Sequence, residues 1–295
     1  MLSLKKILFP VDFSARSRAA APFVLSMAQR YHAKIVLLHA FEPPPPIYGG
    51  MNMVYPEVYD FREVETELKK QLTEFAAAEL PKTDTECIVQ QGFAAAVITE
   101  YADANGVSLI AMPTHGYGPF RRTLLGSVTA KVLHDSNVAV WTDAHAPEPS
   151  HRAHPLPRHI LVALDLKVES KQTLEMALQI ARDAGATVEM VHAAPEGEIT
   201  SLRSEAQIDE VLDAAAREQM LEVRRHAGPD VSVVVDSGSV AKLLRSVALA
   251  KRSDLIVIGR GGIRETFGRF KANAYGIIRE APCPVLSIAA GSAAK

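Results

Sequence analysis

The residues best suited to chemistry form a glycine-containing loop in the first half of the chain. The apolar run Leu109–Met112 is followed by a loop with Gly116, and Gly126-Ser127-Val128-Thr129 then has the composition of a helix start. Unpaired backbone N–H groups and the helix dipole at such a start favour an anion. Glycine lets the backbone approach a phosphate closely, and hydroxyl groups can donate hydrogen bonds to it. The segment therefore predicts a site for the phosphates of a nucleotide.

A second, imperfect copy of this segment lies in the other half of the chain. Leu255–Ile258 repeats the apolar run, and Gly259 and Gly262 keep a glycine turn. The helix start is different: it reads Ala272-Asn273 or, with a loop one residue shorter, Lys271-Ala272. A β-carbon at the position of the helix-start glycine would obstruct close approach of a phosphate. We therefore expect the second copy to bind more weakly than the first.

An acidic residue follows the first apolar run of each half. These residues are Asp12 and Asp165, and Ala40 and Ala193 end the next apolar run in each half. Ligands of open α/β sheets bind at the carboxyl ends of the strands. The acids could instead be ordinary residues at the start of a helix. Because an acid occurs at both equivalent positions, we favour a role in a binding site.

Composition and charge exclude several classes of protein. The 295-residue chain has a net charge of −2 and two cysteines, with neither a basic domain nor metal-ligand spacing. No stretch approaches the roughly 20 apolar residues that a membrane span requires, and the apolar run at the N-terminus is too short for a signal peptide. We expect a cytoplasmic protein without nucleic-acid or membrane partners.

Short apolar runs alternate with helical patterns in both halves, which predicts two α/β domains, each a five-stranded parallel sheet with helices on both faces. The expected strands lie near 6–12, 34–40, 85–91, 107–112 and 137–142, and near 158–164, 186–193, 231–236, 254–259 and 284–289. The expected helices lie near 15–31, 57–80, 93–105 and 124–135, and near 168–184, 203–227, 238–252 and 272–280. The domains span 1–143 and 158–290, and the Pro-rich, aperiodic segment 144–157 is the linker. Residues 42–56, which contain four consecutive prolines, are expected to form a stiff, extended insertion.

Both halves resemble the universal stress protein family. The resemblance rests on the spacing Gly-x2-Gly-x9-Gly-(Ser/Thr), matched from Gly116 to Ser127, and on Ile7–Ser14, Leu37–Ala40 and Pro282–Leu286. It implies a tandem member with two Rossmann-like domains of the adenine nucleotide alpha-hydrolase-like kind. The family has an ATP-binding branch and a non-binding branch, and the binding branch implies ATP as the ligand, with ADP, AMP and accompanying Mg²⁺ as further candidates.

The resemblance also assigns residues to a site. In the first domain, the adenosine end would be formed by Pro10, Val11, Asp12 and Ala40, and the phosphate end by Met112, Gly116, Gly126, Ser127, Val128 and Thr129. The weaker second site would use Asp165, Ala193, Gly259 and Gly262. One departure is Pro113, which stands where the motif has its first glycine and can supply neither an N–H nor a positive φ. The first domain keeps the helix-start Gly-Ser pair, so ATP binding is expected there.

Other functions are less well supported by the sequence. His39 and His192 lie inside apolar runs and are expected to be hydrogen-bonded core residues. No metal site or catalytic constellation emerges, so we expect a regulatory protein and not an enzyme, although slow ATP hydrolysis stays open. The alternative is a non-binding member that acts through protein–protein interaction. The resemblance implies that the two domains pair through their fifth strands, and a homodimer is expected.

Overall fold

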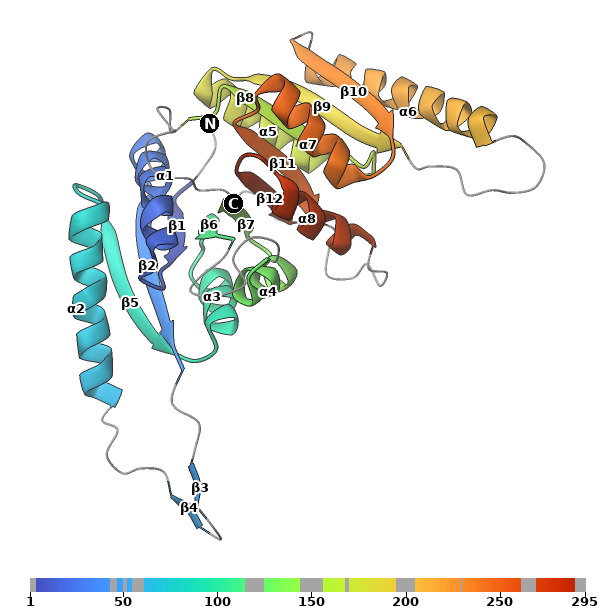
Figure 1. Ribbon diagram of the computed structural model, residues 1–295. Coiled ribbons are helices and arrows are strands. Elements are labelled where there is room, and N and C mark those ends of the chain that lie inside the picture. Colours follow the sequence, from blue (N-terminus) through green and yellow to red (C-terminus); the bar gives the residue numbers. More distant parts are fainter. Residues whose placement is uncertain are drawn as a thin grey trace.

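The computed structural model describes residues 4–42, 47–49, 52–54, 61–114, 125–143, 156–167, 170–194, 205–228, 230–260 and 269–289 (Figure 1). The first half contains β1 (Lys6–Pro10), α1 (Ala15–Tyr31), β2 (Lys34–Phe41), β3 (Ile47–Gly49), β4 (Asn52–Val54), α2 (Phe61–Glu79), β5 (Thr85–Gln91), α3 (Ala94–Ala104), β6 (Leu109–Pro113), α4 (Ser127–Asp135) and β7 (Ala139–Asp143). The second half contains β8 (His159–Ala163), α5 (Ser170–Ala184), β9 (Thr187–Ala194), α6 (Glu205–Ala227), β10 (Val231–Ser237), α7 (Val240–Lys251), β11 (Leu255–Arg260), α8 (Arg269–Glu280) and β12 (Val285–Ala289).

Each half forms a parallel sheet, as the apolar runs predict. The strand order is β5-β2-β1-β6-β7 in the first half and β10-β9-β8-β11-β12 in the second. All neighbouring strands within each of these five-stranded sheets are parallel. The chain therefore winds first to one side of β1 or β8 and then to the other, so the strand order reverses between β1 and β6 and between β8 and β11. Such reversal points are where open α/β sheets bind ligands.

The two sheets join edge to edge into one ten-stranded sheet. Strands β7 and β12 are antiparallel, with Trp141 opposite Leu286 and Val140 opposite Ser287. Two side chains add hydrogen bonds across this seam: Thr142 Oγ1 donates to the Val285 carbonyl (3.3 Å), and Ser287 Oγ donates to the Val140 carbonyl (3.1 Å). Pairing of this kind covers two strand edges that would otherwise be exposed.

Helices cover both faces of the joined sheet. One buried cluster unites α1 and α2 with α5 and α6, and includes Val24, Leu72 and Leu174. The other unites α3 and α4 with α7 and α8, and includes Val132 and Ile277. Each cluster contains residues of both halves, so the hydrophobic core continues across the seam. Among the described residues, no helix has the length and apolar character needed to cross a membrane.

Two elements differ from the sequence expectations. Within the insertion, β3 and β4 pair antiparallel as a two-stranded hairpin, and Figure 1 shows it projecting away from the main sheet. The expected extended excursion did not include this hairpin, in which the chain reverses direction between Gly49 and Asn52. Helix α8 begins at Arg269, earlier than the expected position 272, so Asn273 lies inside the helix and not at its start.

Candidate functional site

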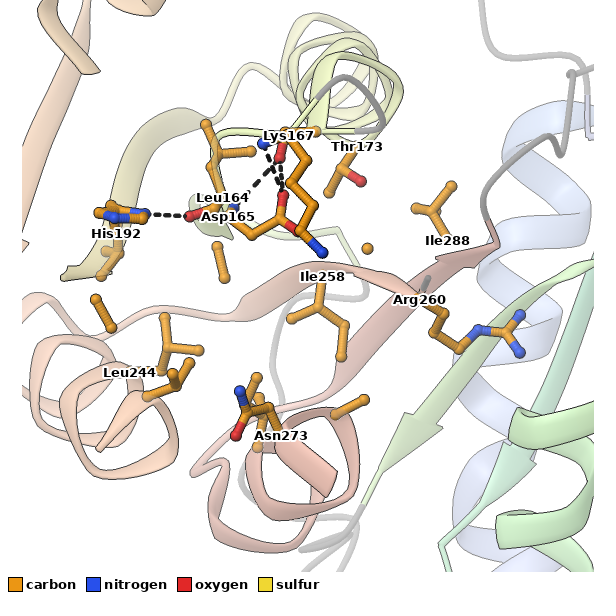
Figure 2. Close-up of a pocket in the computed structure, with 18 of the residues that line it drawn as sticks. Leu164, Asp165, Lys167, Thr173, His192, Leu244, Ile258, Arg260, Asn273 and Ile288 are labelled. Carbon is orange, nitrogen blue, oxygen red and sulfur yellow. Dashed lines mark hydrogen bonds and ion pairs between the residues drawn. The ribbon is translucent and has the colours of Figure 1, made fainter. Parts of the chain in front are cut away.

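The second half contains a cavity of about 350 Å³ at the carboxyl ends of β8, β9 and β11 (Figure 2). Its walls are largely apolar and include Val191, Leu244 and Ile258. The polar groups along its lining include Asp165, Lys167, Ser170, His192 and Asn273. A mainly apolar cavity with a few polar groups at a strand-order reversal is the usual form of a small-molecule site.

Asp165 is held in a fixed position by the turn that follows β8. Its Oδ1 accepts hydrogen bonds from the Lys167 backbone N–H (3.2 Å) and from the Ser170 hydroxyl. The Lys167 ammonium lies 4.0 Å from Oδ2 of the same carboxylate. Leu166 has a φ of 60°, an uncommon backbone conformation for a residue with a side chain. Backbone strain of this kind is concentrated at functional sites.

The first half repeats this turn around Asp12. Oδ1 of Asp12 accepts hydrogen bonds from the Ser14 N–H (3.1 Å) and the Ser17 hydroxyl (2.6 Å), and Phe13 has a φ of 59°. The helix cap is a different residue, because Ser14 Oγ accepts from the Ser17 N–H at the start of α1. The Asp12 carboxylate therefore stabilises the turn between strand and helix by hydrogen bonds, while Ser14 caps the helix. The two halves differ where Ser14 of the first half is replaced by Lys167.

Two histidines occupy equivalent places beside these turns. His39 Nδ1 lies 2.7 Å from the Val11 carbonyl, and His192 Nδ1 lies 2.7 Å from the Leu164 carbonyl. A carbonyl oxygen only accepts, so Nδ1 is the donor, and Nε2 of the neutral ring is left as an acceptor. His192 also lines the cavity, which makes it a candidate site residue, whereas its place inside an apolar run led to the expectation of a core residue. Its occurrence at the same position in both halves, next to Ala193 and Ala40, was the available signal.

The predicted residues of the first site that the structure describes gather at the carboxyl ends of the strands. Pro10 ends β1, Met112 lies next to last in β6, and Ala40 lies next to last in β2. Val11 donates its N–H to the Leu38 carbonyl at 2.9 Å, which extends the β1–β2 contact up to Asp12. Gly116 lies outside the described residues. The adenosine-end residues therefore lie on or directly after the neighbouring strands β1 and β2, and Met112 of the phosphate end lies on β6, on the other side of β1.

The start of α4 has some of its polar groups already engaged. The Gly126 N–H donates to the Thr114 carbonyl at 2.9 Å, and the buried Thr129 hydroxyl donates to the Pro113 carbonyl at 3.1 Å. Ser127 and Val128 are exposed at the first turn. The groups at this helix start that face solvent are therefore those of Ser127 and Val128.

The second site keeps three of its four predicted residues around one cavity. Asp165, Ala193 and Gly259 all line it, while Gly262 lies outside the described residues. Gly259 has a packing reason to be glycine, because a β-carbon there would lie 2.9 Å from Thr173 Oγ1. Asn273, near the start of α8, is exposed and lines the cavity.

Arg260 connects this cavity to the first half. Its backbone ends β11 beside the cavity, while its buried guanidinium donates to the carbonyls of Leu133 (2.5 Å), Ser136 (3.2 Å) and Val138 (2.5 Å). Figure 2 shows the side chain pointing away from the other labelled residues. Burial lowers the pKa of Arg260 to about 10, so the group remains charged at neutral pH. Arg260 thus caps the carboxyl end of α4 from the other domain.

The described residues offer no group of three or more His, Cys, Asp or Glu side chains that could hold a metal ion. The fold and the cavity together define a tandem, Rossmann-like α/β protein with a cavity at the carboxyl ends of the strands of its second half.

The comparison with known proteins gives this class its family. The model of the universal stress protein family matches residues 3–142 and again residues 157–288, and the chain belongs to that family. The family and the tandem arrangement expected from the sequence are confirmed, as is the α/β fold class.

Several individual relatives are similar to one half or to the whole chain. A universal stress protein of Methanocaldococcus jannaschii is 30% identical over 149 residues, which is 46% of this chain and 92% of the relative. A universal stress protein from Archaeoglobus fulgidus, known from its crystal structure, matches at 21% identity and a TM-score of 0.74. The match covers 97% of this chain and 98% of the Archaeoglobus fulgidus chain. A universal stress protein solved in complex with cAMP matches at 18% identity and a TM-score of 0.34, over 46% of this chain and 99% of its own.

Proposed function

We propose that this chain is an adenine-nucleotide-binding regulatory protein of the stress response. The observation that carries the proposal is the cavity where the β8, β9 and β11 ends bring Asp165, Ala193 and Gly259 together. Its apolar walls suit a purine base, and its carboxylate suits a sugar hydroxyl. The same acid turn and histidine contact recur in the first half.

We further propose that ATP binds in the first half, with Mg²⁺ accompanying it. Support comes from Ser127 and Val128, which are exposed at the first turn of α4 with the glycine Gly126 before them. The N–H groups of a helix start are suited to phosphate. The described residues suggest no nucleophile paired with a base, so the proposal is a binding module without dedicated catalysis. A cytoplasmic location is part of the same proposal.

The first test is whether the purified protein binds nucleotide at all. Protein prepared without added ligand is denatured and its released nucleotides are analysed, and equilibrium dialysis then measures ATP, ADP and AMP separately. Absence of any adenine nucleotide at millimolar concentration would refute the proposal.

Variants then assign the binding to a site. Gly126→Val and Asp12→Ala should abolish first-half binding, because they fill the phosphate approach and remove the carboxylate. Lys271→Ala, in the second half, is the control and should leave first-half binding unchanged. Unchanged ATP binding in Gly126→Val would contradict the assignment to the first half.

A second candidate function is protein–protein interaction without nucleotide. It is favoured by Pro113, which has no N–H, and by the Thr129 hydroxyl, which donates to the Pro113 carbonyl instead of facing solvent. In this case the internal β7–β12 pair would be a structural unit and a homodimer would use other surfaces. Light scattering with and without ATP tests it: an ATP-independent dimer together with no nucleotide binding favours this candidate.

A further inference from the structure

We infer that the second-half cavity selects an adenine nucleotide with its phosphate on the ribose 2′ or 3′ position, in preference to a 5′-triphosphate. This inference rests on the proposed function, since it names the ligand class of one of its two sites. It starts from the side chain that differs between two otherwise equivalent turns.

The turns around Asp12 and Asp165 have the same internal hydrogen bonds but a different charge. In both, the carboxylate accepts from a backbone N–H two residues ahead and from a serine hydroxyl five residues ahead. The first of these positions is Ser14 in one half, where the buried side chain caps α1. In the other half it is Lys167, whose side chain is 45% exposed and lines the cavity. Only the second turn, therefore, presents a cation beside its acid.

The position of the Lys167 ammonium suits two adjacent groups of one ligand. Figure 2 shows the side chain running past Asp165 toward Ile258, and the ammonium is 4.0 Å from the carboxylate. A carboxylate at such a site accepts a hydrogen bond from a ribose hydroxyl, while a nearby cation accommodates a phosphate on the neighbouring hydroxyl. With the base against Leu244 and Ile258, the sugar faces this acid–cation pair.

The opposite end of the cavity is poorly suited to a polyphosphate. The buried Val132 and Leu133 of α4 correspond to the buried Ile277 and Ile278 of α8, so Lys271-Ala272 replaces the Gly126-Ser127 pair of the first half. A β-carbon at the position of that glycine obstructs close approach of a phosphate. Among the described residues that line the cavity, Lys167 is the cation beside the acid, while the Arg260 guanidinium points away, so an anion is favoured on the ribose.

The test compares isomeric nucleotides in the 295-residue chain with the first site disabled by Asp12→Ala. Calorimetric titration measures adenosine, 2′-AMP, 3′-AMP, 5′-AMP and ATP. We expect 2′-AMP or 3′-AMP to bind about tenfold more tightly than adenosine, 5′-AMP or ATP, the gain of one charge-assisted hydrogen bond.

Variants of Lys167 show whether this cation is responsible. Lys167→Ser, which installs the first-half residue, should lower 2′- and 3′-AMP affinity about tenfold and leave adenosine affinity unchanged, whereas Lys167→Arg should retain the preference. Lys171→Ser is the matched control, since that lysine lies four residues further along, in α5, with an 82% exposed side chain.

Three results would overturn the inference: equal affinity for all isomers, a preference for ATP, or a preference that Lys167→Ser does not change. If adenosine and ATP also fail to bind the unmodified protein, the proposed function falls as well. If they bind but the ribose phosphates gain nothing, only the ligand class assigned here is wrong.

Discussion

Replacing Arg260 by methionine tests whether the seam between the halves depends on one buried cation. The guanidinium donates to the carbonyls of Leu133, Ser136 and Val138, at and beyond the last turn of α4. Carbonyls at a helix end have no partner within the helix, and an unpaired buried acceptor costs about 1–3 kcal/mol. Methionine has a similar length and no donor, so Arg260→Met removes all three bonds.

The expected magnitude follows from two opposing contributions. Hydrogen bonds made by a charged group contribute about 1.5–3 kcal/mol each. Against them stands the desolvation of the guanidinium, which lowers the pKa of Arg260 to about 10. That lowering corresponds to roughly 3 kcal/mol. The bonds outweigh this cost, so we expect Arg260→Met to lower the free energy of unfolding by about 2–5 kcal/mol.

Urea unfolding followed by fluorescence measures this loss directly. The chain has one tryptophan, Trp141, which lies in β7 at the seam and stacks on Phe23 with ring centroids 3.9 Å apart. Its emission therefore reports on the seam, while circular dichroism reports on the helices. Arg260→Lys should give an intermediate loss of unfolding free energy, because one ammonium cannot reach the three carbonyls that the planar guanidinium contacts.

Arg245→Met, the same change on the exposed side of α7, is the control and should stay within about 0.5 kcal/mol of the unmodified protein. If Arg260→Met also stays within that margin, the guanidinium contributes nothing to the seam, and the reasoning is wrong.

Three further changes test neighbouring contacts. Tyr275→Phe removes the hydrogen bond from the hydroxyl to the Ala130 carbonyl (3.0 Å) and should cost about 0.5–1.5 kcal/mol in urea unfolding; no change would show that this bond is not stabilising. Gly259→Ala places a β-carbon 2.9 Å from Thr173 Oγ1 and should cost about 1–3 kcal/mol, and adding Thr173→Ala should recover most of the loss; failure to recover would locate the strain elsewhere. Burial and a nearby carboxylate raise the pKa of Tyr31 to about 12, so stability should fall as pH rises from about 10 to 12; Tyr31→Phe should flatten that part of the pH profile, and an unchanged profile would contradict the assignment.

The repeated fold could be predicted because its signals are local. Each buried parallel strand is a continuous apolar run, such as Ile7–Phe9, and each helix has its own periodicity. Asp12 and Asp165 follow those runs directly. Their position at the carboxyl ends of strands could therefore be predicted without knowledge of distant residues. The hairpin in the insertion was missed although Gly49-Gly50 is a turn signal, because the four prolines before it dominated the interpretation.

Arg260 could not be predicted, because everything that explains it is distant in sequence. Its three acceptors come from residues 133–138, more than a hundred positions away. The equivalent residue in the first half is Thr114, which instead donates to the Asp143 carbonyl within its own half. Two copies of one fold have therefore acquired different roles at the same position. A repeat in sequence does not reveal such a difference, since it depends on how the copies meet.

The structure gives another reason for the difference between Pro113 and Gly259. By sequence alone, Pro113 is the loss of a glycine that a phosphate loop needs. In the second half that glycine is required by packing, because Thr173 of α5 leaves no room for a β-carbon. The corresponding residue of α1 is Ala20, a smaller side chain, and α1 also packs on β6, where Pro113 lies. The larger strand residue of the first half thus accompanies a smaller residue at the corresponding helix position, which is the exchange that packing alone would favour. The two halves then differ at two other places near the strand ends: Ser14 against Lys167 beside the acid, and Gly126-Ser127 against Lys271-Ala272 at the helix start.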